Sequence, residues 1–284
     1  MDQFRVEPRT MFGVVKLQQD FNDGASQIGG IVTGMNRNLP DDETFDFLTS
    51  RAYSAGLEFQ HQWNNRAWSL RGFFAGSRVE GDTVALTRIQ RSSNHYFQRP
   101  DATRVGVDST ATSLAGAQWR LDLTRQGGRH WSWRTWLGQS TPEFEINDVG
   151  FSRASEKLDA GAFVSYREIT PNSVFKSYSI SLWSFANWDH EALDEPGSWS
   201  SWEAARKAGT TNLSIRGTFL NEWGGDVNLS YSPDHTNFGN TRGGPAMLDP
   251  GSVNLRGNIN TDRRKALNFK VGFSLREGFS DSVH

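Results

Sequence analysis

The sequence contains no cysteine among its 284 residues, which excludes disulfide bonds and thiolate chemistry and fits a periplasmic or outer-membrane protein. No stretch approaches 18 consecutive apolar residues, so a transmembrane helix is excluded. The formal net charge is -2, which argues against a nucleic-acid-binding protein that depends on bulk positive charge. The mean hydropathy of -0.60 suggests a soluble protein, but spanning strands of β-barrels are half polar and escape such averages.

The residues that follow Met1 contain no apolar core of the kind found in signal peptides. Either the protein is cytoplasmic or the chain lacks its natural N-terminus. The C-terminal segment, REGFSDSVH, is equally abrupt and lacks the terminal aromatic residue typical of outer-membrane barrels. We therefore expect a truncated fragment of a larger protein, from which strands of the barrel can be missing.

Apolar and polar residues alternate strictly in many segments, and the 28 glycines, 11 tryptophans and 19 phenylalanines suit a strand-rich protein. In residues 53–63, Tyr53, Leu57 and Phe59 oppose Glu58 and Gln60. Comparable segments lie near 11–21, 25–37, 52–63, 66–79, 109–125, 129–141, 156–169, 174–188, 211–223, 225–232, 252–260 and 265–276. The pattern predicts an all-β protein with about 12 antiparallel strands.

Short and long connections follow one another along the chain. The short ones include NDGA (22–25), NNR (64–66) and TDRRK (261–265). The long ones, which we expect to be extracellular, lie near 38–51, 80–108, 142–155, 189–210 and 233–251, and one helical turn is expected around Trp202–Lys207. This rhythm is typical of up-and-down transmembrane barrels and is not expected of a Greek-key sandwich. We predict one β-barrel domain over residues 1–284.

The two faces of the predicted strands differ in chemistry. Twelve long strands enclose an interior too wide for side chains alone to fill, so a polar, water-filled lumen with lipid outside is the expected solution. The candidate lumen-lining residues are Glu58, Gln60, Arg71, Arg120, Asp122, Arg134, Arg167, Arg216, Lys270 and Arg276. They either bias permeation through a pore or brace the wall as ion pairs. A soluble β-sheet protein with the same residues in water remains the alternative.

Tryptophans near segment ends suggest aromatic girdles at the membrane interfaces. These are Trp63, Trp68, Trp131, Trp188 and Trp223. In the long loops, a second aromatic group could stack on sugar rings or simply pack: His95, Tyr96, Phe97, Trp199 and Trp202.

Four stretches carry a family resemblance: residues 8–37, 90–102, 146–161 and 241–266, with Arg-Gly-Gly-Pro (242–245) and Asp-Arg-Arg (262–264) the most distinctive. They resemble the C-terminal outer-membrane β-barrel domain, of unassigned function, of bacterial proteins that carry an N-terminal module similar to carbohydrate-binding family 9. The resemblance implies an outer-membrane barrel with a glycan-related role. The sugar-binding module itself is absent from this sequence.

Signatures of catalysis and of cofactor or metal binding are weak. Glu143, Glu145 and Asp148 are the only candidates for a paired-carboxylate hydrolase, and a solvated acidic loop is the simpler interpretation. The sequence has no G-x-S-x-G motif, no H-E-x-x-H motif and no phosphate-binding loop. Asp41, Asp42 and Glu43 could hold a hard cation but lack EF-hand spacing. We expect no catalytic, cofactor or metal site.

The resulting prediction is a bacterial outer-membrane barrel that is not an enzyme. It acts as a channel, or as a membrane anchor and receptor, in glycan binding or uptake. Its expected partners are the lipid bilayer, lipopolysaccharide and polysaccharide or oligosaccharide, with no nucleic acid. The alternatives are a membrane-anchored hydrolase whose catalytic part lies outside this chain, and a soluble β-sheet ligand-binding protein.

Overall fold

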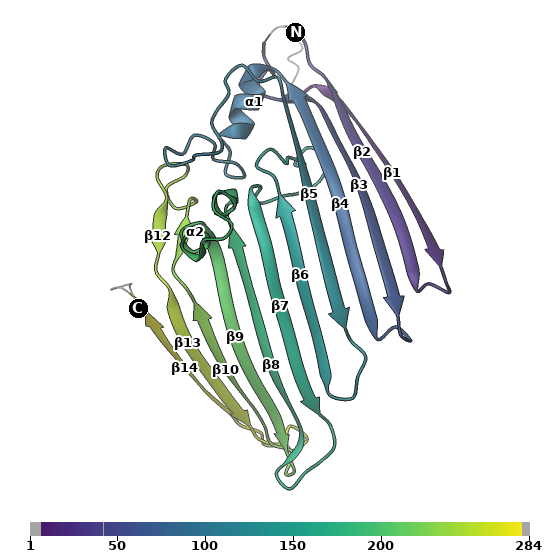
Figure 1. Cartoon of the computed structure of the whole chain (residues 1–284), viewed down its shortest axis with the longest axis vertical. Coiled ribbons are helices and arrows are strands. Elements are labelled where there is room, and N and C mark those ends of the chain that lie inside the picture. The colour runs from purple at the N-terminus through teal and green to yellow at the C-terminus, as the bar shows by residue number, and fades with distance from the viewer. Residues whose placement is uncertain (1–6, 42, 280–284) are drawn as a thin grey trace.

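A computed structural model describes residues 7–41 and 43–279. Its main feature is one antiparallel sheet of twelve strands in the order β1-β2-β3-β4-β5-β6-β7-β8-β9-β10-β13-β14 (Figure 1). The strands are β1 (Arg9–Phe21), β2 (Ser26–Asn38), β3 (Thr49–Trp63), β4 (Trp68–Gly81), β5 (Ser113–Arg125), β6 (Trp131–Ser140), β7 (Lys157–Glu168), β8 (Phe175–Trp188), β9 (Arg206–Phe219), β10 (Gly224–Ser232), β13 (Ser252–Asn260) and β14 (Lys270–Gly278). The prediction of an all-β, antiparallel, twelve-stranded meander is confirmed.

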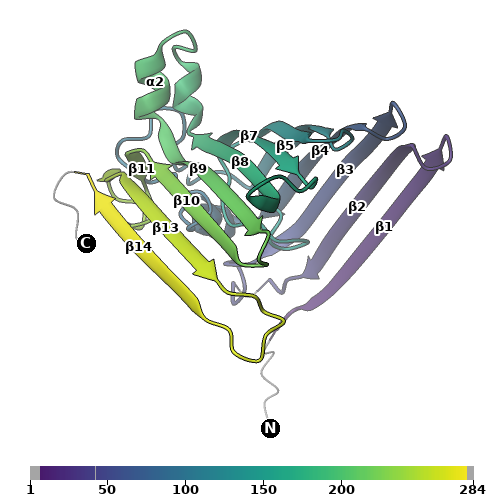
Figure 2. The same ribbon diagram turned by 90° about the horizontal axis from the view of Figure 1, so that it is seen from below.

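The prediction of a closed barrel needs correction. Figure 2 shows that the sheet is strongly bent, yet the bend does not bring β1 alongside β14. Among the described residues, β1 pairs with β2 alone and β14 with β13 alone, so each has one edge without a strand partner. Closure depends on pairing between these two edges, and local alternation carries no information about that pairing.

Tight turns join the strands at one end of the sheet and long loops join them at the other (Figure 1). The Asn64-Asn65-Arg66 turn illustrates why the short connections form. All three residues have positive φ, at 52°, 53° and 62°, a conformation that asparagine tolerates better than most residues. The predicted hairpin is therefore confirmed, and its strands pair from Trp63↔Trp68 upward to Thr49↔Gly81.

The long loops contain more structure than the sequence pattern indicated. Helix α1 (Thr83–Gln90) is capped at its N-terminus by Asp82, whose carboxylate accepts a 2.9 Å hydrogen bond from the Val84 backbone N–H. A 3-10 helix η1 (His190–Leu193) and helix α2 (Trp199–Ala204) lie in the long loop between β8 and β9. In the long loop between β10 and β13, β11 (His235–Asn237) pairs with β12 (Met247–Asp249). In the described part of the chain, no helix has the length and apolar character needed to span a membrane.

Several boundaries differ from the sequence prediction, and two of them have a clear local cause. The expected helical turn at Trp202–Lys207 is displaced to Trp199–Ala204, because Arg206 and Lys207 already belong to β9. The last strand begins at Lys270 rather than near residue 265. Asp262 binds both the backbone and the side chain of Arg264, and Phe269 donates to Thr261, which extends the connection to nine residues.

The buried core lies against the sheet at its loop end. Met35, Ala52, Val79 and Leu114 form one cross-strand row over β2, β3, β4 and β5. This row packs with Ala85 and Leu86 of α1 and with Phe97. The row belongs to the same face as Glu58 and Arg120, so the core covers only the loop end of a face that is otherwise polar.

We expect Leu86→Ala to destabilise the protein by about 2–5 kcal/mol, because Leu86 is fully buried and its removal leaves a cavity. Val84→Ala in the same helix is the matched control, since Val84 is 53% exposed. Chemical unfolding followed by tryptophan fluorescence measures the difference. Equal unfolding midpoints for the two variants would show that α1 is not packed on the sheet.

Candidate functional site

Strand register divides the sheet into two faces, because residues paired across antiparallel strands point to the same side. We call the two sides the polar face and the apolar face. The polar face carries every predicted lumen residue: Glu58, Gln60, Arg71, Arg120, Asp122, Arg134, Arg167, Arg216, Lys270 and Arg276. Their shared side follows from the register, whereas their role in lining a lumen stays a prediction.

An ion-pair cluster braces the centre of the polar face. Asp122 of β5 accepts from Arg120 at 3.0 Å and from Arg134 of β6 at 2.8 Å. Arg120 also reaches Asp159 of β7 at 2.9 Å, and Trp136 donates to the same carboxylate at 3.1 Å. Two aspartates and two arginines thus join three strands with balanced charge, as expected of a wall brace.

Other polar-face charges are less constrained. Lys16 approaches Glu58 at 3.4 Å. Within the described ranges, no ion pair involves Arg71, Arg167, Arg276, Arg216 or Lys270. The last two line a polar cavity of about 490 Å³ at the turn end, together with Asp226 and Asn258. Free cations on this side give the polar face a positive component beside its balanced centre.

The connection between β4 and β5, residues 82–112, crosses the loop end toward three other loops, and we call it the strap (Figure 1). Its contacts reach loop 141–156 through His95, loop 189–205 through Thr103, and loop 233–251 through Asp101, whose carboxylate accepts from Ala246 at 3.3 Å. Loop 141–156 is in turn bonded to the sheet: the backbone N–H of Glu145 donates to the Ser77 hydroxyl on the polar face. The strap and loop 141–156 therefore fold over the polar face.

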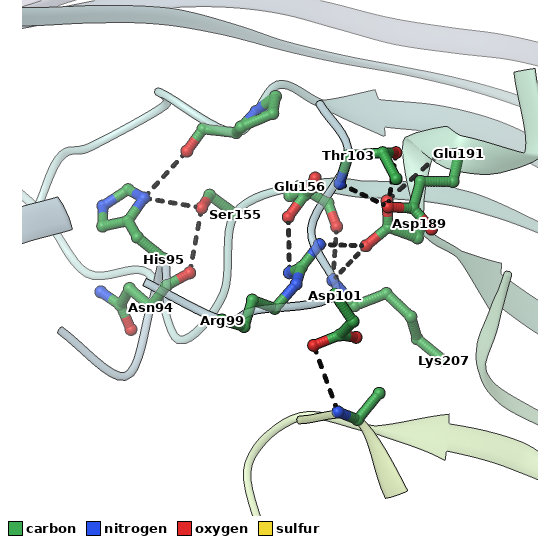
Figure 3. A network of polar contacts seen from close by, with 12 residues as sticks. Asn94, His95, Arg99, Asp101, Thr103, Ser155, Glu156, Asp189, Glu191 and Lys207 are labelled. Atoms are coloured by element: carbon green, nitrogen blue, oxygen red, sulfur yellow. Dashed lines mark hydrogen bonds and ion pairs between the residues drawn. The ribbon is translucent and has the colours of Figure 1, made fainter. Parts of the chain in front are cut away.

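Ser155, His95 and Glu145 share the connectivity of a catalytic triad, but their hydrogen bonds oppose that role. His95 Nδ1 lies 2.8 Å from the Pro142 carbonyl and 2.9 Å from Ser155 Oγ, and Nε2 lies 2.8 Å from Glu145 Oε2. The Pro142 carbonyl can only accept, so Nδ1 is the ring nitrogen that donates on this side. Ser155 donates its own proton to the Asn94 carbonyl at 3.0 Å (Figure 3). Nδ1 therefore has no lone pair with which to act as a base for Ser155, and all three side chains are buried.

A second buried cluster joins the strap to two other loops and to β9 (Figure 3). Arg99 donates to Glu156 at 3.0 Å and to Asp189 at 3.2 Å, while Lys207 lies 3.5 Å from Asp189. The Arg99 guanidinium also stacks 4.2 Å above the Phe238 ring. Burial, with the nearby charge of Asp189, raises the pKa of Glu156. We call Arg99, Glu156, Asp189 and Lys207 the latch, since these four charges come from segments far apart in sequence.

The remaining sequence candidates are structural or exposed. Asp148 accepts from Thr49 at 2.6 Å and pairs with Arg37 at 3.1 Å, so it anchors its loop to β2 and β3. His95 and Phe97 are buried in the loop layer, and Tyr96 is half-buried. Trp202 packs edge-on against Trp188 with ring centres 5.2 Å apart, while Trp199 is 69% exposed. Of the predicted stacking residues, Trp199 is the accessible one.

Asp41 and Glu43 are exposed, and Asp42 lies outside the described residues. Across residues 7–41 and 43–279, no three His, Asp or Glu side chains are grouped so that they could hold a metal ion. The strap and the latch escaped sequence reasoning altogether. Arg99 was visible only as one residue of a basic, aromatic loop, and the other three latch residues lie 57, 90 and 108 residues further along the chain.

These features define an open, two-faced antiparallel sheet whose polar face is covered at one end by loops. The sequence matches, over residues 1–283, the family described as Domain of unknown function (DUF5916), and the chain belongs to this family. Neither a curated protein nor a solved structure matches the chain. The association with a carbohydrate-binding family 9-like module stays a prediction.

We expect Arg99→Met to loosen the strap strongly, because it leaves the carboxylates of Glu156 and Asp189 buried without their shared cation. Breaking a buried pair in this way costs about 3–5 kcal/mol. Arg91→Met is the control, since Arg91 is an exposed strap residue. Limited proteolysis should cut the strap faster in Arg99→Met alone; unchanged cleavage would mean that the latch does not hold it.

The strap is also expected to respond to acid through Glu145. Burial acts to raise the pKa of Glu145, but the bonds from His95 and Asn147 outweigh it and lower the pKa. A lowered pKa contributes stability above the ordinary glutamate value of about 4.3, and this stability is lost as the pH falls through the folded value. Hydrogen exchange of residues 94–97, corrected for intrinsic rates, should stay constant from pH 6 to about pH 4.3 and accelerate below it.

Glu145→Gln should lose most of this pH dependence, whereas Glu143→Gln, in the same loop, should retain it. Identical profiles for wild type and Glu145→Gln would refute the assignment to this carboxyl group.

Proposed function

We propose that this chain forms the membrane-spanning wall of a bacterial outer-membrane β-barrel. In this proposal the apolar face contacts lipid, and the polar face borders a water-filled interior. The protein then serves as a channel, or as a membrane anchor and receptor, in glycan binding or uptake. Its proposed partners are the bilayer, lipopolysaccharide and oligosaccharide or polysaccharide.

The observation that carries the proposal is that the sheet exposes its large apolar side chains and buries a charged one, the reverse of a protein folded in water. Large apolar side chains on the apolar face are exposed along the whole sheet: Leu17, Val32, Leu57, Phe74, Leu137, Leu182, Ile215, Leu229, Phe273 and Leu275. Asp122 on the polar face, in contrast, is buried. An exposed apolar surface of this extent is unfavourable in water and is the expected surface of a barrel in lipid.

Aromatic rings at the turn end support the same interpretation. Neighbouring ring contacts on the apolar face run from β3 to β9, with ring centres 4.9–6.1 Å apart within each contact. They involve Trp63, Trp68, Trp133, Trp131, Tyr166, Tyr178, Phe175 and Phe219. Such a belt is typical of a membrane interface, where the amphipathic rings meet the headgroups.

Charged side chains lie at the opposite end of the apolar face. Arg78 and Arg51 contact Glu80 at 2.7 Å and 3.5 Å near the long loops. The apolar band is therefore limited by charges at one end and by aromatic rings at the other. Its strands contain 9–15 residues, and about 9–11 are needed to cross a bilayer at a tilt.

The open edges follow from the same proposal. In lipid, unpaired backbone N–H and C=O groups each cost several kcal/mol, so a spanning sheet must close. We propose that β1 and β14 pair with further strands, which complete the barrel beyond the twelve strands of this chain. The polar face would then enclose the lumen.

We expect Leu57→Arg to impair membrane assembly, because a lipid-facing arginine near the bilayer midplane costs about 2–4 kcal/mol. Gln60→Arg is the matched control on the same strand, because Gln60 lies on the polar face, where the proposal places a new charge in water and not in lipid. Both variants, expressed behind a secretion signal, are compared by outer-membrane fractionation and by heat-modifiable migration in gels. Full solubility of the wild type without detergent would contradict the proposal.

A further inference from the structure

The polar face carries a group of aromatic side chains that its charges do not explain. Trp136 is accounted for, since it bonds to Asp159 and lies within 6 Å of two arginines. Phe163, Trp183 and Phe185 make no such contacts. Phe163 of β7 is the direct cross-strand neighbour of Trp183 on β8, and the rings of Trp183 and Phe185 are 5.0 Å apart. Together they form an apolar island inside a polar surface.

Packing beneath the loops does not account for this island. The cores under the loops consist of other residues, centred on Leu86 and on Leu158. Trp183 lies in the middle of its strand and is 39% exposed. Exposed apolar side chains that gather into a patch, unlike ones scattered singly, are a sign of a binding site.

The surroundings of Trp183 are uncharged and can form hydrogen bonds. Its nearest neighbours on the polar face are Phe163, Asn212 of β9, and Ser181 and Phe185 on its own strand. Asn212 donates to Ser230 at 2.7 Å, which leaves its side-chain oxygen free to accept. Ser181 shares a 2.8 Å bond with Ser165. An amide therefore borders Trp183 on the β9 side and a hydroxyl group lies next along β8, while Arg134, which is opposite Phe163 on β6, is paired with Asp122.

We propose that Trp183, flanked by Phe163 and Phe185 and bordered by Asn212, is a stacking platform for the sugar rings of a neutral oligosaccharide. The C–H face of a pyranose is apolar and matches the indole face, while its ring hydroxyls match amide and hydroxyl partners. A neutral sugar is favoured because all four polar-face neighbours of Trp183 are uncharged. This inference rests on the proposed function and names the ligand class of the polar face.

The test measures binding of defined neutral hexasaccharides, namely maltohexaose, cellohexaose, xylohexaose and laminarihexaose, to the purified chain by calorimetry. We expect at least one to bind the wild type and Trp183→Ala to weaken that binding about tenfold or more, the loss expected for a stacking contact. Trp223→Ala is the matched control, because Trp223 is a comparably accessible tryptophan, 41% exposed, in the turn before β10. It should bind as the wild type does.

Two further variants, Asn212→Ala and Trp183→Phe, distinguish loss of the binding site from misfolding of Trp183→Ala. Asn212→Ala should weaken binding with the aromatic rings intact, and Trp183→Phe should retain part of the affinity. No binding of any hexasaccharide, equal affinity for wild type and Trp183→Ala, or a loss confined to Trp223→Ala would each overturn the platform.

The outcome is separable from that of the membrane proposal. Binding is measured on the purified chain, with or without detergent, and does not require insertion. A chain that assembles in the outer membrane but binds no hexasaccharide disproves the platform alone. A soluble chain that binds through Trp183 disproves the membrane role alone.

Discussion

The two-residue period of the strands is the constraint on which the rest of this structure depends. Successive side chains point to opposite sides, and antiparallel pairing carries each side from one strand to the next. The row Arg71, Asp122, Trp136, Gly161 and Phe185 shows this over five strands. A register shift of one residue at any step would move arginines onto the apolar face, so pairing is strongly specified.

The two-residue period gathers charged side chains on the polar face and also leaves an apolar row there at the loop end. The protein accommodates each of them differently. In the centre, Arg120 and Arg134 are neutralised by Asp122 and Asp159, and their side chains lie across the strands. At the loop end, the same face becomes apolar in the row from Met35 to Leu114 and is covered by α1. The strap thereby gains a hydrophobic foundation on the sheet.

Beyond α1, the strap residues Phe97, Val105, Val107 and Ala111 also pack against this core, and buried charges join the strap to the other loops. Arg99 binds two carboxylates from two different loops, while its Nε and Glu156 Oε1 have no partner among the described residues. Buried pairs of this kind contribute little net stability, but the loss of one partner is expensive. The latch is therefore better understood as a device that selects one loop arrangement than as a source of folding energy.

The sequence predicted those features that are local. Alternation located β2, β3, β5 and β13 to within a few residues and placed Arg71, Arg134 and Arg276 on one side. It failed where the cause is non-local. The partners of Arg99 lie in other loops, the pairing of β1 and β14 depends on the whole curvature, and the start of β14 was shifted by the Asp262–Arg264 contacts. His95 and Phe97 resembled ligand-binding residues in sequence because burial by a distant loop leaves no local mark.

The edge strands connect the shape of the sheet to its proposed setting. Soluble proteins protect exposed edges with charges, proline or short strands. Here β1 has 13 residues, contains no proline, and carries Met11, Val15 and Leu17 on its apolar face; β14 carries Val271, Phe273 and Leu275 there. The apolar band therefore continues undiminished to both edges. An edge of this kind favours pairing with another strand, which is the arrangement that the proposed barrel requires of β1 and β14.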